Sequence, residues 1–323
     1  MERVLITGAD GFVASHLIAE LCRDSRAEIF GVGLKDNPLA AARFSYEIAD
    51  LCDADIVHSV LETLRPNSIF HLAAQPSVAH SWRDPWSTYR SNILCQLNLM
   101  EAARDIGLEA SFHIACSSEE YGKVGPGEVP LDETARLKPC SHYAVSKVTQ
   151  EVLGHMYHEA FGWRVFATRS FNQAGPGQSS DFAISSFARQ IALIEAGGCE
   201  PVLKVGNLDA QRDFTDVRDT ARAYRLLMEK GRAGMSYNVC SGVARKMSDV
   251  LQELLILSSK EIRVEVDPAR HRPSDIPIVT GDSGALRQET GWSPEIPFSR
   301  TLEDTLDYWR VVLADEPRAG AGN

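Results

Sequence analysis

Two side chains that can exchange a proton, Tyr143 and Lys147, stand four residues apart in the chain. On a helix this spacing places both on one face, with their Cβ atoms roughly 5–6 Å apart. A free tyrosine has a pKa of about 10, and a nearby ammonium group favours the phenolate and lowers that pKa. The pair could therefore move a proton to or from a hydroxyl or carbonyl oxygen. The alternative is a surface Tyr–Lys pair on an amphipathic helix, so the surrounding elements must decide.

A glycine-containing turn near the start of the chain indicates a nucleotide-binding element. Residues 3–7 form a short apolar run, typical of a buried strand, and Gly8 ends it. A helical pattern follows over residues 12–21. Strand, glycine turn and helix form the context of a dinucleotide fingerprint, in which Gly8 permits the turn and Gly11 lets a pyrophosphate approach the helix. A plain turn between a strand and a helix is the alternative.

The order of the elements predicts the fold class. Short apolar segments alternate with helical patterns up to about residue 169. We therefore expect an α/β fold with a doubly wound parallel sheet, the NAD(P)-binding Rossmann fold. The expected strands are residues 3–7, 28–32, a short one ending at Asp50-Leu51, 68–72, 111–116 and 164–169, and the expected long helices are residues 85–107 and 141–161.

The alternation fails beyond residue 169, which predicts a second, smaller mixed α/β substrate domain. A helix–strand unit at residues 220–239 should rejoin the sheet, and residues 207–219 are expected as a loop. The predicted division is a cofactor domain of residues 1–170 and 215–241, a substrate domain of residues 171–214 and 242–310, and a tail of residues 311–323.

The end of the second strand bears on the choice of dinucleotide. Gly33 stands where an acidic residue usually accepts the ribose 2′-hydroxyl. With Lys35 and Arg43 nearby, a 2′-phosphate is acceptable, so NADP(H) is favoured over NAD(H). Asp36 could still accept a ribose hydroxyl, which leaves NAD(H) open.

Polar residues follow the fifth strand, beginning at Ser117. Ligands of open α/β sheets bind beyond the carboxyl ends of the strands, so this segment should face the cofactor, although a solvated loop is the alternative. Glu119 is notable because a carboxylate in a buried site is unfavourable unless it is paired.

Composition limits the classes of partner. The chain has 323 residues, 44% of them hydrophobic and 24% charged, as is ordinary for a globular protein. A net charge of −11 argues against nucleic acid or an anionic membrane as partner. The seven cysteines show no Cys-x-x-Cys pair and no zinc spacing, so we expect free thiols, no metal and a cytoplasmic location. No apolar run reaches the length of a membrane-spanning helix.

Three motifs in this order resemble those of the extended short-chain dehydrogenases/reductases, and the resemblance covers nearly the whole chain. They are Thr7-Gly8-x-x-Gly11-Phe12, Ser117 four residues before Tyr121-Gly122, and Tyr143-x-x-x-Lys147. Later segments are similar to the group of GDP-6-deoxy-4-keto-D-mannose reductases and GDP-mannose 4,6-dehydratases. These segments are residues 169–178, 204–208, 212–219, 237–242 and 272–275.

The resemblance implies roles for particular residues. Its catalytic residues are Ser117, Tyr143 and Lys147, with Glu119 as the additional base of the dehydratases. Its cofactor-binding residues are Gly8, Asp10, Gly11, Phe12, Val13, Lys35, Asp50, Leu51, Leu72, Ala73, Ala74, Tyr143 and Lys147. Its substrate-binding residues are Ser118, Glu119, Asn172, Arg189, Lys204, Arg212, Arg272 and Asp275.

The implied activity is NAD(P)H-dependent reduction of the C4 ketone of a GDP-6-deoxy-4-keto-hexose. GDP-mannose 4,6-dehydration stays open, because both enzymes of the group keep a Glu at the place of Glu119, and a catalytically silent dinucleotide sensor is a further alternative. Gln173-Ala174, Pro76 and His142 depart from the usual pattern near the expected sugar pocket and leave the exact sugar open. The resemblance also implies a homodimer, through a four-helix bundle of residues 85–107 and 141–161 from two copies.

Overall fold

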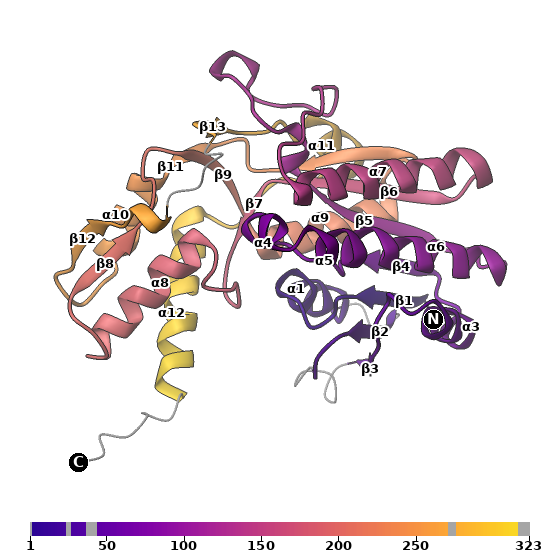
Figure 1. Cartoon of the computed structure of the whole chain (residues 1–323), viewed down its shortest axis with the longest axis horizontal. Helices are drawn as coiled ribbons and strands as arrows, with labels where there is room; N and C mark the ends of the chain where they lie inside the picture. The colour runs from indigo at the N-terminus through magenta and orange to yellow at the C-terminus, as the bar shows by residue number, and fades with distance from the viewer. Residues whose placement is uncertain (1, 24–26, 37–43, 271–275, 316–323) are drawn as a thin grey trace.

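A seven-stranded parallel sheet dominates the computed structural model of the chain, with the strand order β10-β6-β5-β4-β1-β2-β3 (Figure 1). The structure describes residues 2–23, 27–36, 44–270 and 276–315. The sheet grows from β1 first through β2 and β3, and then on the other side from β4 onward. The expected doubly wound sheet is confirmed, and the reversal beside β1 marks where such folds bind ligands. The strands are β1 Glu2–Thr7, β2 Ala27–Gly33, β3 Ser45–Ile48, β4 Ser68–His71, β5 Ser111–Ser117, β6 Arg164–Ser170 and β10 Met235–Val239.

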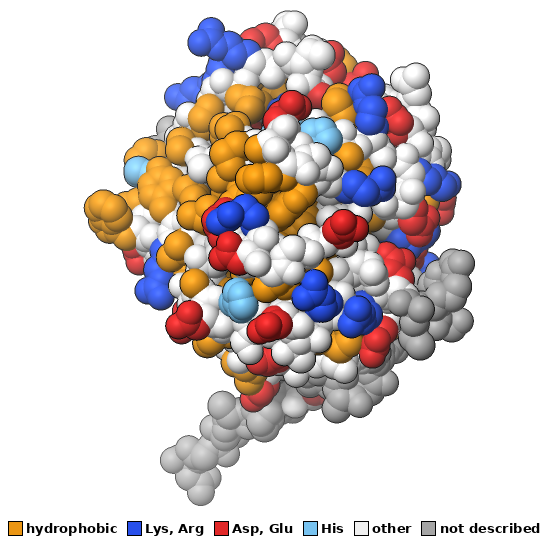
Figure 2. Space-filling view, turned by 90° about the vertical axis from the view of Figure 1, so that its right-hand side faces the viewer, with side chains coloured by type: hydrophobic (Ala, Val, Ile, Leu, Met, Phe, Trp, Pro, Cys, Tyr) orange, Lys and Arg blue, Asp and Glu red, His pale blue; other side chains and the backbone are white. Residues whose placement is uncertain are grey.

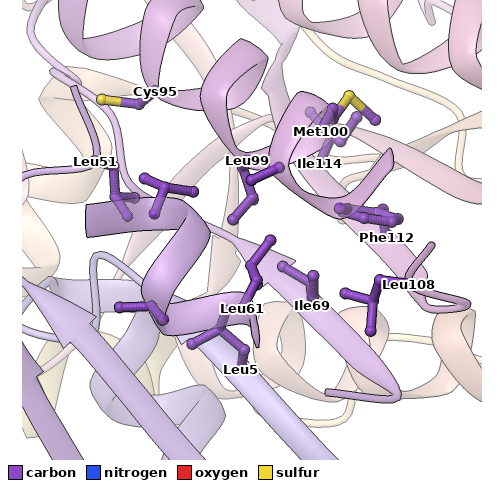
Figure 3. Close-up of a cluster of buried hydrophobic side chains, with 14 of the residues drawn as sticks. Leu5, Leu51, Leu61, Ile69, Cys95, Leu99, Met100, Leu108, Phe112 and Ile114 are labelled. Atoms are coloured by element: carbon purple, nitrogen blue, oxygen red, sulfur yellow. The ribbon is translucent and has the colours of Figure 1, made fainter. Parts of the chain in front are cut away.

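Helices cover both faces of the sheet. Because successive side chains of a strand point to opposite faces, Leu5 packs with α3 and α6, whereas Val4 and Ile6 pack with α1 and α9. Figure 3 shows the first of these cores, where β1, β4 and β5 meet leucines of α3 and α6. The expected helix at residues 85–107 is interrupted by a π-helical turn, η1 Arg90–Leu94. The helices of these layers are α1 Phe12–Leu21, α3 Ala54–Leu64, α4 Val78–Arg83, α5 Pro85–Tyr89, α6 Cys95–Asp105, α7 His142–Phe161, α9 Val217–Lys230 and α11 Gly284–Thr290.

A smaller α/β part lies beside the sheet, at the left of Figure 1. Its hydrophobic core is formed by α8, α10 and α12 with side chains of β8 and β9. The elements of this part are β7 Asn172–Ala174, α8 Ala183–Glu195, β8 Val202–Val205, β9 Gln211–Asp216, β11 Ala244–Lys246, α10 Met247–Ile256, β12 Arg263–Val266, β13 Ile278–Val279 and α12 Phe298–Asp315. The division of the chain into two domains stays a prediction.

Two local expectations are wrong. The segment expected as a loop at residues 207–219 contains β9, which pairs with β7, β11 and β13. Most of its side chains are polar, and the buried Asp213 is tolerated because it accepts the N–H groups of Ser241 and Gly242 at 2.8 and 2.9 Å. Helix α12 continues to Asp315, past the expected start of the tail. Neither α12 nor any other helix among the described residues is long and apolar enough to cross a membrane.

Candidate active site

The carboxyl ends of the central strands lie level with one another. Thr7 is opposite His71 in the pairing of β1 with β4, and Ser117 is opposite Ser170 in that of β5 with β6. The segments that follow these strands therefore meet at one edge of the sheet, where open α/β folds bind ligands. Thr7, the last residue of β1, contacts both β4 and the segment that follows it. Its Oγ1 lies 2.9 Å from His71 Nδ1 and accepts the N–H of Ala73 at 3.3 Å.

Gly8 and Gly11 shape a turn that fits the pyrophosphate of a dinucleotide. Gly8 has a φ of +66°, and a Cβ at this position would lie 2.8 Å from backbone atoms of Ala73. Gly11 is the N-cap of α1, and a Cβ there would lie 2.9 Å from the carbonyl oxygen of Gly8. Without side chains at these positions, a phosphate can approach the first N–H groups of α1, where the helix dipole favours negative charge. Asp10, Phe12 and Val13 belong to the same turn and to the first residues of this helix.

The end of β2 brings an acidic side chain close to the predicted ribose site. A Cβ at Gly33 would collide with the Asp10 carboxylate and the Tyr46 hydroxyl, so glycine here makes room for both. Lys35 is exposed beyond Gly33, and its carbonyl oxygen accepts the Tyr46 hydroxyl. Arg43 lies outside the described residues. Asp36 is exposed next to Lys35, and its charge acts on Tyr46 as that of Asp10 does. The structure thus places two acidic residues and one basic residue near the end of β2, where the choice of dinucleotide is expected to be made.

Asp50 and Leu51 lie in the connection from β3 to α3 rather than at the end of the strand, because β3 ends at Ile48. Leu51 is buried, and its carbonyl oxygen accepts Asn98 Nδ2 at 2.9 Å. Asp50 is exposed, with its carboxylate 3.7 Å from Arg90 Nη2. The remaining predicted cofactor residues, which directly follow β4 and are partly buried, are Leu72, Ala73 and Ala74.

Tyr143 and Lys147 lie on one face of α7, as their spacing predicts. Lys147 is only 4% exposed and donates a hydrogen bond from Nζ to Ala115 O of β5 at 2.8 Å. Its Nζ lies 5.9 Å from the centre of the Tyr143 ring. Ser141 begins the helix by accepting the N–H of Ala144 at 3.0 Å, which fixes the position of the first turn. A lysine buried against the end of a strand excludes the alternative of a surface Tyr–Lys pair.

The pKa of Tyr143 shifts in the direction opposite to the expected one. Burial raises its pKa, and the Glu119 and Glu120 carboxylates raise it further, whereas a hydrogen bond with Ser117 lowers it. The net direction is opposite to the expected lowering, and the effect of Lys147 on this pKa stays a prediction. Burial also lowers the pKa of Lys147 itself. Tyr143 is therefore protonated and can donate its proton to an oxygen.

Ser117 ends β5 and begins a short 3₁₀ helix, η2 Ser118–Tyr121. Its hydroxyl accepts the N–H of Glu119 at 3.2 Å, and its own N–H is donated to Glu120 Oε1 at 3.1 Å. These reciprocal bonds form a capping box that holds the Ser117 hydroxyl beside Tyr143. Glu119 is partly buried and lies close enough to Tyr143 for its charge to raise that pKa. The structure thus brings all four predicted catalytic residues together.

Asn92 joins α7 to the segment after β4, although no sequence pattern singles it out. Its Nδ2 donates to Ser146 Oγ at 2.8 Å, and its Oδ1 accepts the N–H of Gln75 at 2.7 Å. It is fully buried and lies in the π-helical turn η1, a kind of irregularity that is frequent at functional sites. In the sequence it is an ordinary polar residue of a helical stretch, so only the structure shows its role.

A buried cluster of charged residues lies behind η2. Arg169 donates Nε and Nη2 to the two carboxylate oxygens of Glu151, at 2.9 and 2.6 Å. Glu120 is 0% exposed, and its Oε2 lies 3.6 Å from Arg169 Nε. Burial, and then the charge of Glu151, raises the pKa of Glu120 well above its usual range. Burial opposes ionisation of Glu151 as well, but Arg169 overcomes it and lowers that pKa. The surroundings thus favour the neutral form of Glu120 and the ionised form of Glu151.

Two of the predicted substrate residues lie on paired strands next to the sheet. Asn172 is exposed and begins β7, directly after β6, and it is opposite Phe214 of β9. Arg212 lies on β9, where its Nη1 donates to Ile276 O at 2.6 Å. Ser118, in η2, is partly buried. These positions are compatible with contacts to a substrate that reaches Tyr143.

Two further predicted substrate residues, Lys204 and Arg189, lie away from Tyr143. Lys204 is exposed on β8, and Arg189 on α8 places its guanidinium 5.7 Å from the centre of the Trp309 ring. Both elements lie at the left of Figure 1, far from α7. Arg272 and Asp275 lie outside the described residues.

The sheet, the glycine turn after β1 and the Ser–Tyr–Lys set at β5 and α7 define an NAD(P)-dependent oxidoreductase of the extended short-chain dehydrogenase/reductase type. A family model described as GDP-mannose 4,6 dehydratase matches residues 5–305, and the chain belongs to this family. The resemblance found from the motifs is thereby confirmed.

Within this family, the sequence identity to a reductase can be compared with the identity to a dehydratase. The chain is 35% identical over 315 residues to GDP-6-deoxy-D-mannose reductase from Pseudomonas aeruginosa, covering 98% of this chain and 99% of the relative. It is 28% identical to GDP-mannose 4,6-dehydratase from Vibrio cholerae, covering 94% and 92%. The solved structure of RMD from Pseudomonas aeruginosa complexed with NADPH superposes with a TM-score of 0.87 at 34% identity, covering 97% and 100%. The dehydratase is thus the more distant of these relatives.

Proposed function

We propose that the protein reduces the C4 ketone of a GDP-linked 6-deoxy-4-keto-hexose. Tyr143 donates its proton to the ketone oxygen as negative charge develops there, and Ser117 donates a hydrogen bond to the same oxygen. The buried charge of Lys147 stabilises the phenolate that remains on Tyr143. The hydride for this reduction comes from a bound NAD(P)H.

The observation that carries this proposal is the meeting of Tyr143, Lys147 and Ser117 at the carboxyl end of β5. Ketone reduction requires a proton donor, and the raised pKa of Tyr143 keeps its proton in place until charge develops on the substrate. The 35% identity to GDP-6-deoxy-D-mannose reductase supports the substrate class. Asn172 and Arg212, on paired strands next to the sheet, are the described residues that we propose for the nucleotide-sugar.

Glu119 favours GDP-mannose 4,6-dehydration as a second candidate function. In that reaction C4 is first oxidised, a base removes the C5 proton as water leaves C6, and there is no net redox change. Glu119 is a partly buried carboxylate close to Tyr143 and suits such a base. The identity to GDP-mannose 4,6-dehydratase is lower, 28% against 35% to the reductase, so we rank dehydration second.

Mass spectrometry of the nucleotide-sugar products distinguishes the two functions. The substrates are GDP-mannose and its 4-keto-6-deoxy derivative, each with and without NADPH. A reductase consumes NADPH only with the keto sugar and yields a product with two more hydrogen atoms. Conversion of GDP-mannose without NADPH would contradict the proposal and support dehydration.

We infer that NADP(H) is the preferred dinucleotide. Lys35 is exposed at the end of β2, where its charge suits a 2′-phosphate, and Gly33 replaces the usual acidic residue. Asp10 opposes this preference, because its carboxylate lies beside Gly33. The ratio of kcat/KM for NADPH to that for NADH measures the preference, and Lys35→Ala should lower kcat/KM for NADPH alone.

We also infer a homodimer that forms through α6 and α7. Both helices expose hydrophobic side chains, and Figure 2 shows a hydrophobic patch on the side of the molecule toward which α6 and α7 extend in Figure 1. A contiguous apolar patch of this kind usually marks a contact with another protein. The exposed hydrophobic residues of η1, α6 and α7 are Leu94, Leu97, Val145, Val152, Met156 and Phe161.

A further inference from the structure

Two cysteine thiols that lie 43 residues apart in the chain are in contact. Cys52 follows β3 in the connection to α3, Cys95 is the first residue of α6, and their Sγ atoms are 3.2 Å apart. Cys52 is partly buried, whereas Cys95 is 6% exposed. A disulfide bond joins sulfurs at about 2.05 Å, so closure requires an approach of roughly 1 Å. The backbone of a connection between elements can adjust by this amount more readily than the sheet can.

The thiol pair lies beside Asp50 and Leu51, which are predicted to contact the cofactor. The N–H of Cys52 is donated to Asp50 Oδ1 at 2.9 Å, and Leu51 O accepts Asn98 Nδ2 of α6 at 2.9 Å. Figure 3 shows Cys95 above Leu51 at the edge of the hydrophobic core. A covalent link here would therefore change how this segment sits on α6.

We propose that Cys52 and Cys95 form a redox-sensitive dithiol, which a low-molecular-weight disulfide oxidises to an intramolecular disulfide that weakens cofactor binding. The effect on the cofactor rests on the proposed function, through Asp50 and Leu51. The formation of the disulfide depends only on the two thiols and their geometry.

The chemistry proceeds by two thiol–disulfide exchanges. Cys52 reacts first because it is the more exposed: its thiolate attacks one sulfur of glutathione disulfide, that S–S bond breaks and one glutathione thiolate leaves. Cys95 then loses its proton to solvent and attacks the Cys52 sulfur, and the second glutathione thiolate leaves. Two protein thiols lose two electrons in total, and one glutathione disulfide is reduced to two thiols. Burial, and then the neighbouring Cys52, raises the pKa of Cys95, so the second exchange becomes faster as the pH rises.

A metal ion is the competing use of the same groups. The two sulfurs and a carboxylate oxygen of Asp50 lie within 4.8 Å of one another, which suits a thiophilic divalent cation. Arg90 opposes a cation, because its Nη2 lies 3.7 Å from the Asp50 carboxylate. The geometry therefore favours oxidation of the two thiols over metal binding.

The test maps the thiols of the full-length protein after incubation with glutathione disulfide in the presence of EDTA. Free thiols are alkylated, and unreduced peptides are identified by mass spectrometry. We expect a link between the Cys52 and Cys95 peptides in the wild type and in Cys199→Ala, which removes an exposed cysteine elsewhere. The link should be absent from Cys52→Ala and Cys95→Ala. If glutathione stays on Cys52, or no link forms, the inference is overturned.

The Kd for NADPH, measured by fluorescence titration, tests the consequence. We expect the oxidised wild type to bind NADPH several-fold more weakly, dithiothreitol to restore the affinity, and Cys52→Ala to show no change on oxidation. An unchanged Kd in fully linked protein would overturn the coupling to the cofactor. Failure of the reduced protein to bind NADPH would instead contradict the proposed function, and the peptide map separates these two results.

Discussion

Lys147 reaches from α7 to the carbonyl oxygen of Ala115, with 2.8 Å between Nζ and the oxygen. That carbonyl lies two residues before Ser117, so the bond holds α7 in place against the strand that ends in the predicted hydrogen-bond donor. The same ammonium group lies 5.9 Å from the centre of the Tyr143 ring. One buried side chain thus positions two elements and supplies the charge that proton donation by Tyr143 requires.

Replacing Lys147 with methionine removes the charge and keeps most of the length of the side chain. We expect kcat for the keto sugar to fall on the order of a hundredfold, because the phenolate left on Tyr143 is no longer stabilised. Steady-state kinetics with NADPH measure this effect. Lys260→Met, at an exposed lysine, is the matched control and should leave kcat unchanged. A wild-type kcat in Lys147→Met would remove Lys147 from the mechanism.

Removing the Asn92 side chain should destabilise the protein. In Asn92→Ala the buried N–H of Gln75 and the Ser146 hydroxyl each lose a partner, and a buried unpaired polar group costs about 1–3 kcal/mol. Urea unfolding monitored by circular dichroism gives the free energy of unfolding. Asn67→Ala, at an exposed asparagine that accepts the N–H of Arg3, should change it by less than about 0.5 kcal/mol. Equal effects of the two variants would contradict a special role for Asn92.

Local patterns predicted the parts of the site that depend on short spacing. Gly8 is required by a tight turn, and Tyr143 and Lys147 share one face of a helix because they are four residues apart. The sequence alone therefore predicts their local positions. The strand β9 was not predicted, because it consists mostly of polar residues and pairs with strands that are distant in the sequence. The surroundings of Tyr143 show a related limit: a lysine four residues away is visible in the sequence, whereas burial by packing is not. Asn92 and the contact of Cys52 with Cys95 likewise join residues that no spacing rule connects.

Glu120 should make stability depend on pH. Its pKa is raised in the folded protein by burial, so the unfolded chain ionises more readily, and stability falls as the pH rises from about 4.5 toward the folded pKa. Glu120→Gln removes this loss and can still accept the N–H of Ser117. We expect the variant to exceed the wild type in free energy of unfolding by an amount that grows with pH, by at most about 1.4 kcal/mol per pH unit.

Urea unfolding of Glu120→Gln and wild type at several pH values between about 5 and 8 measures this growth. Glu62→Gln, at an exposed glutamate of α3, controls for the loss of a carboxylate as such. A difference between wild type and Glu120→Gln that stays constant with pH would show that Glu120 is ionised in the folded protein.

A charge on α7 should break the inferred homodimer. Val152 is 58% exposed on this helix, and Val152→Arg would place two arginines near the two-fold axis of the bundle. We expect light scattering at micromolar concentration to give the mass of a dimer for the wild type and of a monomer for the variant. Val311→Arg, at a valine that is 61% exposed on α12, should remain a dimer. A monomeric wild type would contradict the inference directly.

The last prediction separates reduction from dehydration through Glu119. A dehydratase needs a base for the C5 proton, whereas a ketone reductase needs only the proton of Tyr143. Glu119→Gln keeps the size of the side chain and removes the basic carboxylate. For a reductase we expect a loss of about tenfold in kcat/KM, equivalent to about 1.4 kcal/mol, because the polarity around Tyr143 changes. Tyr143→Phe removes the proton donor itself and should cost on the order of a hundredfold or more.

Steady-state kinetics of the wild type, Glu119→Gln and Tyr143→Phe on both substrates, with NADPH oxidation and product mass recorded, make the comparison. A reductase gives unequal losses in the two variants, and only on the keto sugar. A dehydratase loses nearly all turnover of GDP-mannose in both, because base and tyrosine act in the same sequence of steps. The reductase proposal fails if the wild type converts GDP-mannose without NADPH and Glu119→Gln stops that conversion, since only a C5 base explains such a loss.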